Sequence, residues 1–172
     1  ITEGRPEVTD VEPVAAPGPG IPTQPLDVLR LGAAIENRSE HPLGRAIVRA
    51  ARRRELTFGE PESFQAVAGS GVRARLEGRD WLMGSPAHLE EQAVVVDPAD
   101  ARRMEELEAG GKTLVGLAEM NGKSGKLAGI IGLADRVKPT SAAAIRRLSE
   151  ELGLEVWMIT GDNPVTARVV AR

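Results

Sequence analysis

Two polar residues, Glu36 and His41, are spaced so that they could bind one ligand together. The apolar spacing predicts that Glu36 ends one helix and that Pro42 starts the next, which places His41 at a helix entrance. A carboxylate and an imidazole about one turn apart can hydrogen-bond the polar edge of a purine. Taken alone, His41 could equally be a half-buried histidine at a helix start.

A second feature is the pair Gly69 and Gly71, which interrupts a strand pattern around Ser70. Neither glycine carries a Cβ atom and both accept positive φ, so the backbone here could approach a ligand closely. A β-bulge or a tight strand bend would use the same residues. The pair alone therefore supports either interpretation.

The run Thr160-Gly161-Asp162-Asn163 follows an apolar segment, residues 155–160, that reads as a short strand. Open α/β sheets bind ligands at the carboxyl ends of their strands. A hydroxyl, a flexible glycine and a carboxylate at that place suit a phosphoryl group or its magnesium ion. A capped turn into a helix at Pro164 is the simpler alternative.

Two further runs imitate the end of a phosphate-binding P-loop, Gly111-Lys112-Thr113 and Gly122-Lys123-Ser124. That loop needs another glycine five residues before the first, and these positions hold Glu106 and Leu117. We therefore interpret the two runs as a helix stop and a hairpin turn. His88 lies on a short helix of surface character and is expected to be solvated.

The elements that must position these residues are short and varied. Helical spacing is expected from Leu26 to Glu36, from Pro42, after Asp97-Pro98 up to Gly110, and from Pro139 to Gly153. Strands are expected at residues 64–68, 72–76, 80–83, 113–120, 126–133 and 155–160.

This order predicts an α/β (α+β) fold with a split domain. Residues 1–24 are a proline-rich, extended lead-in and linker, and residues 25–128 form an antiparallel sheet with flanking helices. Residues 129–172 have the strand-helix-strand order of a doubly wound unit but too few strands to form a hydrophobic core alone. We therefore expect Ile1–Val14 to pack with residues 129–172, which makes the antiparallel unit an insertion.

Composition narrows the classes of function. The chain has 172 residues and a net charge of -3, which disfavours nucleic-acid binding, and it has no cysteine for a disulfide or thiolate site. No apolar run approaches the roughly 20 residues of a membrane helix. Because the chain starts at Ile1 and stops within a helical pattern at Arg172, we expect it to be part of a longer protein.

Taken together, these motifs resemble the metal-transporting branch of the P-type ATPases over nearly the whole chain. Ser39-Glu40-His41-Pro42-Leu43 is similar to the His-Pro signature of that branch, with Glu36 five residues before the histidine. Gly69-Ser70-Gly71 is similar to its Gly-x-Gly segment, and Thr160-Gly161-Asp162-Asn163 to the TGD motif of its phosphorylation domain. Ile1-Thr2-Glu3-Gly4 reads like the continuation of Asp-Lys-Thr-Gly-Thr, whose acceptor aspartate would lie upstream.

The resemblance implies a nucleotide-binding domain inserted into a Rossmann-like, haloacid-dehalogenase-like phosphorylation domain. It implies ATP and Mg2+ as cofactors. The implied partners are the remaining phosphorylation, actuator and membrane domains of a pump in the cell membrane, and nucleic acid is not among them. The chain itself would lie in the cytoplasm. The transported ion would be a heavy metal, with Cu+ favoured. The implied roles are adenine contact for Glu36 and His41, and backbone approach to the nucleotide at Gly69, Gly71 and Gly84. Thr160, Gly161 and Asp162 would serve phosphoryl transfer, with Asp135 and Lys138, near the hinge, as secondary candidates for the same role.

Two residues depart from the pattern of that family. Gly44 stands where alanine often follows the His-Pro-Leu run, which should cost the helix about 1 kcal/mol. Ser85 stands where asparagine often follows the hairpin glycine, Gly84. Two other functions stay open, a soluble phosphatase of the same superfamily with a cap domain and a non-catalytic interaction module. The acceptor aspartate is not among these residues, so the resemblance implies ATP binding without a phosphoenzyme.

Overall fold

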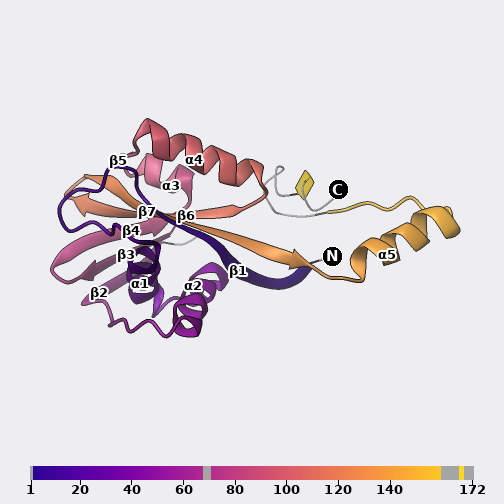
Figure 1. Cartoon of the computed structure of the whole chain (residues 1–172), viewed down its shortest axis with the longest axis horizontal. Helices are drawn as coiled ribbons and strands as arrows, with labels where there is room; N and C mark the ends of the chain where they lie inside the picture. Colours follow the sequence, from indigo (N-terminus) through magenta and orange to yellow (C-terminus); the bar gives the residue numbers. More distant parts are fainter. Residues whose placement is uncertain (1, 68–70, 160–166, 169–172) are drawn as a thin grey trace.

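The computed structural model describes residues 2–67, 71–159 and 167–168. One sheet forms the centre, with strand order β1-β7-β6-β4-β3-β2 and every neighbouring pair antiparallel, while the short β5 runs parallel to β7 (Figure 1). The predicted α/β class with an antiparallel sheet is confirmed. The strands are β1 (Thr2–Pro13), β2 (Ser63–Val67), β3 (Gly71–Leu76), β4 (Arg79–Gly84), β5 (Val94–Val95), β6 (Thr113–Asn121) and β7 (Ser124–Val137).

Two pairs of helices cover the two faces of this sheet (Figure 1). The first pair is α1 (Pro25–Glu36) and α2 (Pro42–Arg53), and the second is α3 (Pro86–Glu91) and α4 (Pro98–Ala109). Gly32 of α1 lies against Ile131 and Met83, so α1 packs closely on β7 and β4. Gly116 of β6 faces Leu89 of α3 on the other side. The main core is therefore split into two apolar layers by the sheet.

The four helices on the sheet, α1 to α4, all begin with proline, and the sequence predicts this start for α2, α3 and α4. Proline fixes φ near the helical value and lacks the N–H group that would be unpaired in the first turn. The residue before each proline has extended backbone, for example Ser85 with φ -64° and ψ 159°. The side chain of Ser85 accepts a hydrogen bond from the N–H of His88 and so caps α3.

Glycine with positive φ makes the turns. Gly78 has φ 73° between β3 and β4, and Gly122 has φ 65° between β6 and β7. In the second turn Asn121 pairs with Ser124, so Gly122 and Lys123 form a two-residue hairpin loop. Gly111, with φ 78°, follows the end of α4. Both P-loop-like runs are thus turn and helix-end structures, as the sequence predicted.

The proline-rich start of the chain is extended, as expected, and residues 2–13 join the sheet as β1. Among the described strands β1 pairs with β7 alone, and an edge strand tolerates Pro6 and Pro13 because one of its sides needs no ladder hydrogen bonds. The guanidinium of Arg103 on α4 binds both carboxylate oxygens of Glu12, which fastens α4 to this strand. The sheet therefore includes the segment expected to pack with the later unit.

β7 crosses residues 128 and 129 without a break, at the point where the sequence suggests a domain boundary. The division into 1–24, 25–128 and 129–172 stays a prediction. After β7 the chain leaves the sheet as α5 (Ser141–Arg146) and a π-helical turn η1 (Arg147–Glu151), which extend away from it (Figure 1). Gly153, with φ 63°, follows the end of this helical part, where the sequence placed a helix stop.

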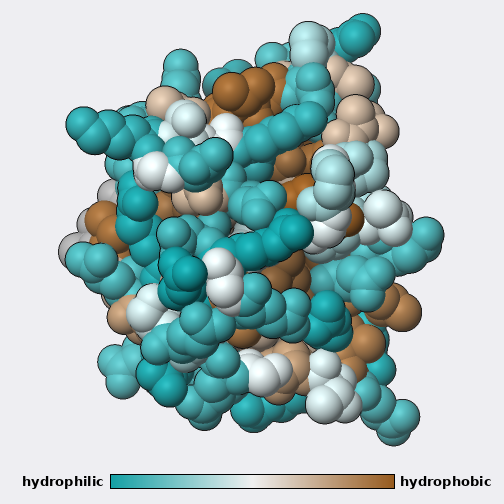
Figure 2. All heavy atoms as spheres, turned by 90° about the vertical axis from the view of Figure 1, so that its left-hand side faces the viewer, coloured by the Kyte–Doolittle hydropathy of each residue, from teal (hydrophilic) through white to brown (hydrophobic). Residues whose placement is uncertain are grey.

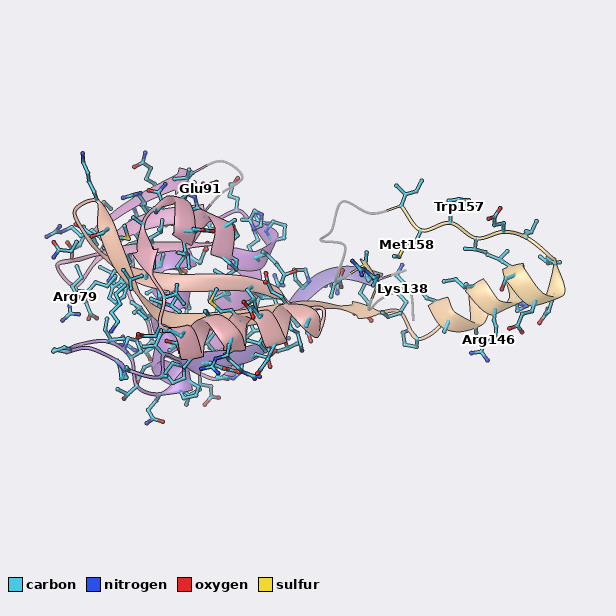
Figure 3. All side chains as sticks on the ribbon, turned by 90° about the horizontal axis from the view of Figure 1, so that it is seen from above. Arg79, Glu91, Lys138, Arg146, Trp157 and Met158 are labelled. Carbon is cyan, nitrogen blue, oxygen red and sulfur yellow. The ribbon has the colours of Figure 1, made fainter. Side chains whose placement is uncertain are left out.

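The expected strand at residues 155–160 is wrong for the residues that the structure describes. Residues 153–159 have no regular secondary structure, and Trp157 and Ile159 are 77% and 97% exposed. An apolar strand needs neighbouring strands to satisfy its backbone and helices to cover it. None of the described strands pairs with residues 153–159. Figure 3 shows Trp157 on this segment, and Arg146 on the preceding helix α5, away from the packed sheet.

Within the described ranges, every helix is too short or too polar to cross a lipid bilayer. The opposite end of the molecule, seen in Figure 2, is mainly hydrophilic, with separate small hydrophobic areas. Arg79 lies at this end and forms a 3.0 Å ion pair with Glu119. The same guanidinium faces the carbonyl oxygen of Pro19, so it holds the loop that leads into α1.

Candidate functional site

His41 is the N-terminal cap of α2, as the sequence predicted. Its Nδ1 atom accepts a hydrogen bond from the backbone N–H of Leu43 at 3.3 Å. An acceptor nitrogen carries no hydrogen, so in the neutral ring the hydrogen is on Nε2. The His41 side chain is exposed. The cap therefore fixes the ring on the helix and leaves an N–H group that can donate to a ligand.

Glu36 ends α1 and is buried, with only 7% of its surface exposed. Its Oε2 atom has no hydrogen-bond partner among the described residues. Burial raises the pKa of this carboxyl group, while a hydrogen bond from Ser39 and the charge of His41 act in the opposite direction. A buried oxygen without a partner is costly, so this atom is suited to accept a hydrogen bond from a ligand.

Ser39 joins these two residues through the turn between α1 and α2. Its Oγ atom accepts a hydrogen bond from the N–H of His41 at 3.2 Å, and its own N–H donates to the carbonyl oxygen of Glu36 at 2.8 Å. Arg38, in the same turn, donates to a carboxylate oxygen of Glu60 at 2.7 Å. The structure thus brings the predicted pair Glu36 and His41 together in one hydrogen-bonded turn.

Gly71 and Gly84 are cross-strand partners at the ends of β3 and β4. A Cβ atom on Gly71 would lie 2.1 Å from the carbonyl oxygen of Met83, closer than any real contact. The pairing of these strands therefore requires glycine at residue 71 whether or not a ligand binds. Since α1 packs against both β3 and β4, the glycine pair and the helix that carries Glu36 belong to one packed unit.

The other predicted residues are not part of this cluster. Asp135 accepts hydrogen bonds from the N–H groups of Gly4 and Arg5, at 3.0 and 3.1 Å, and so joins β7 to the start of β1. Lys138 follows directly after β7 (Figure 3). Gly69, Thr160, Gly161 and Asp162 lie outside the described residues. In the described ranges no three His, Cys, Asp or Glu side chains gather where a metal ion could bind.

The prediction that His88 is solvated is wrong. His88 is 5% exposed, and its Nδ1 atom lies 3.4 Å from a carboxylate oxygen of Glu91. The reason is that α3 lies on the sheet against β4 and β6, and His88 and Leu89 are the two of its six residues that this contact buries. A helix of less than two turns has too few residues for its spacing to reveal the buried side.

One pocket was not anticipated from the sequence. It has a volume of about 500 Å³ and lies over β2, β3, β4 and β6, and it includes neither Glu36 nor His41. The alternating polar residues of β2 and β3 were its only signal. Its lining residues are Ser63, Phe64, Gln65, Arg73, Ala74, Asp80, Trp81, Met120 and Gly122.

Known proteins resemble the whole chain in sequence. The family model of haloacid dehalogenase-like hydrolases matches residues 1–172. A probable copper-exporting P-type ATPase V of Mycobacterium tuberculosis is 41% identical over 172 residues, which is 100% of this chain and 21% of that protein. A copper-exporting P-type ATPase B of Archaeoglobus fulgidus is 36% identical over 99% of this chain and 22% of its own length. The chain thus spans about a fifth of these relatives.

Solved structures agree with this similarity. A zinc-transporting PIB-type ATPase in the E2.Pi state has a TM-score of 0.72 at 35% identity, over 99% of this chain and 25% of that one. The N-domain of a copper-transporting P-type ATPase has a TM-score of 0.57 at 25% identity, over 74% of this chain and 99% of that one. The resemblance read from the motifs is confirmed: the chain belongs to the haloacid dehalogenase-like hydrolase family, and its relatives there are heavy-metal P-type ATPases.

Proposed function

We propose that this chain is the ATP-binding cytoplasmic part of a P-type ATPase that couples ATP hydrolysis to the transport of a heavy-metal cation. One observation carries the proposal, the buried Oε2 atom of Glu36 without a partner among the described residues, in the same hydrogen-bonded turn as His41. The amino group of adenine is a donor that would satisfy this oxygen, and the Nε2–H group of His41 would donate to a ring nitrogen of the base. The relatives favour Cu+ as the ion.

Glycine residues would contribute to nucleotide binding because they have no side chain. At Gly84, which is buried at the end of β4, no side chain stands between the backbone and a ligand. Gly71 is its strand partner, and Gly69 precedes it in the same Gly-Ser-Gly run. Few aromatic residues are available to stack on the base, since the chain has two phenylalanines, two tryptophans and no tyrosine. We therefore expect modest affinity for ATP.

Phosphoryl transfer would be the work of another part of the chain. Thr160, Gly161 and Asp162 have the residue types that hold a phosphoryl group and its metal ion. Mg2+ would arrive with the triphosphate and neutralise the charge that develops on it. The acceptor aspartate, the remaining phosphorylation domain, the actuator domain and the membrane domain would come from the parent pump, in the cell membrane.

A titration with ATP followed by amide NMR tests nucleotide binding. We expect chemical shift changes concentrated near Glu36, His41, Gly69 and Gly71 at millimolar ATP, and smaller changes with GTP, whose base offers an oxygen in place of the adenine amino group. The absence of any response at millimolar ATP would overturn the proposal. A soluble phosphatase would instead respond to phosphate groups without preference for adenine.

Two variants sharpen this experiment. His41→Asn keeps a side-chain oxygen that can cap α2 but replaces the imidazole by a shorter amide, so helix stability is preserved while the base loses the Nε2–H donor at its position. We expect it to weaken ATP binding about tenfold, the effect of one lost hydrogen bond to a bound ligand. Arg102→Ala, on the opposite face of the sheet, is the control and should bind ATP like the unchanged chain.

A further inference from the structure

The described sheet has two edge strands, β1 and β2, and they differ in how well they exclude a further strand (Figure 1). An edge strand presents unpaired N–H and C=O groups, which natural proteins protect with proline, bulges or charged side chains. β1 has all three kinds of protection. It contains Pro6 and Pro13, its register against β7 shifts twice, and Glu7 and Asp10 are charged. The edge formed by β1 is therefore protected.

The other edge, β2, lacks these features. Its residues Ser63–Val67 include neither proline nor a charged side chain, and their register with β3 is regular from end to end. Among the described elements only β3 is in extensive contact with β2. Ser63, Gln65 and Ala66 are exposed. The outer side of β2 is therefore open to an additional strand, which would satisfy its free N–H and C=O groups.

The two faces of β2 differ, because successive side chains of a strand point to opposite faces of the sheet. On one face Phe64 is partly buried against the core and lies in line with Ala74 of β3 and Trp81 of β4. On the other face Gln65 is exposed and lies opposite Arg73 of β3. A strand added to β2 would therefore need apolar side chains on the first face and polar ones on the second.

Arg73 decides which polar side chain suits the second face. It donates a hydrogen bond to the side-chain oxygen of Gln92, and in the described ranges its guanidinium has no carboxylate partner. The next arginine on this face, Arg75, is paired with Glu62 at 3.4 Å and with Asp80 at 3.0 Å. A guanidinium binds carboxylates well because its N–H groups can form two parallel hydrogen bonds. Arg73 therefore offers a positive charge that a carboxylate from another molecule can pair with.

The spacing of the strands permits this contact. Neighbouring strands lie about 4.8 Å apart, so a strand added to β2 would lie about 10 Å from β3. The side chain of Arg73 and that of a glutamate on the added strand can span this distance together. The pocket of about 500 Å³, which Gln65 and Arg73 help to line, provides space for the two side chains beside β2.

We propose that β2 is a docking edge for an extended segment of a partner protein, which adds a strand to the sheet with apolar side chains towards Phe64 and a carboxylate towards Arg73. Main-chain hydrogen bonds would supply affinity, and the alternating side chains specificity. A second copy of this chain fits less well, because β2 itself contains no carboxylate for Arg73. Neither Glu36 nor His41 belongs to this edge or its pocket, so the inference does not depend on ATP binding.

Two soluble peptides test the docking edge on the unchanged chain. One alternates valine and glutamate, and the other alternates valine and lysine. We expect the glutamate peptide to shift the amide NMR signals of β2 and of Arg73, and to slow hydrogen exchange of the β2 amides, because these would become paired. The lysine peptide should bind about tenfold more weakly, because it brings a like charge to Arg73.

Substitutions of Arg73 separate charge pairing from general stickiness. Arg73→Gln should remove the preference between the two peptides, and Arg73→Glu should reverse it in favour of the lysine peptide. Arg45→Glu makes the same change of charge on an exposed position of α2, and it should bind both peptides like the unchanged chain. Thermal unfolding of each variant shows that the compared chains are folded, and Arg73→Gln is informative even where Arg73→Glu is not folded.

Three results would overturn the docking edge. The first is the absence of any change in the β2 amides at millimolar glutamate peptide. The second is a preference for the glutamate peptide that persists in both Arg73 variants. The third is a dimer of the unchanged chain whose β2 amides are already protected from exchange, because a second copy would then cover this edge.

Discussion

At the scale of single residues, Glu36 carries an ionisable group into a place where water is nearly excluded. Its carboxyl group has Ser39 as a donor and the Oε2 atom without a partner. Burial without hydrogen bonds to both carboxylate oxygens destabilises the ionised form of Glu36, and its pKa is therefore raised. Such a residue weakens the fold slightly, as is common where a side chain is kept for binding.

The raised pKa of Glu36 makes a prediction about stability. The folded state binds the carboxyl proton more tightly than the unfolded state, so stability falls as pH rises through the interval between the two pKa values. Glu36→Gln cannot ionise and escapes this loss. We expect the difference in Tm between the variant and the unchanged chain to move in favour of the variant from about pH 4 to pH 7.

Thermal unfolding at a series of pH values measures this difference. Glu40→Gln, an exposed change four residues later, is the control and should show no such trend. A difference that stays constant with pH would mean that Glu36 titrates like an exposed glutamate in the folded chain.

At the scale of elements, the joining of β3 and β4 depends on a missing side chain. Gly71 faces Gly84 across the ladder, and the backbone of β4 stands where a Cβ atom of residue 71 would be. From the sequence, the Gly-Ser-Gly run was open to two interpretations, a ligand-binding backbone or a strand bend. For Gly71, strand pairing explains why the residue must be glycine. A role in ligand binding is compatible with this structural role.

This contact predicts the effect of a methyl group. Gly71→Ala should destabilise the chain by about 1–3 kcal/mol, because the backbone of β4 must move to admit the new atom. Denaturant unfolding measures the change. Gly59→Ala is the control, since a Cβ atom there would meet nothing within 4 Å, and it should be neutral within about 0.5 kcal/mol. Equal effects of both variants would contradict the strand-pairing role.

At the scale of the whole molecule, the packed sheet and the chain after it differ in their contacts. Val137 ends the last strand, and beyond it α5 has no buried residue and its contacts are chiefly with η1. Leu152, Leu154 and Trp157 are exposed there. Trp81, in contrast, is 3% exposed within the core. The stability of the described fold therefore lies in the part up to Val137.

Removal of residues 138–172 tests this distribution. We expect the shortened chain to keep the Tm of the complete chain within about 2 °C, because the described residues of the removed segment are not buried in the core. Its fluorescence should shift to shorter wavelength and resist quenching by iodide, because the exposed Trp157 is gone and the buried Trp81 remains. A large fall in Tm would show that the segment supports the sheet.

Local patterns were sufficient for the helix at Pro42 with its His41 cap, the hairpin turn at Gly122 and the motifs that identified the relatives, because each depends on residues close together in the chain. Tertiary structure alone placed β1 at the edge of the sheet, buried His88 and set the Glu36 carboxyl group against Gly44. It also left residues 153–159 without the strand neighbours that their apolar pattern had suggested. Pairing, burial and unsatisfied oxygens depend on atoms from distant segments, and no spacing along one segment can specify them.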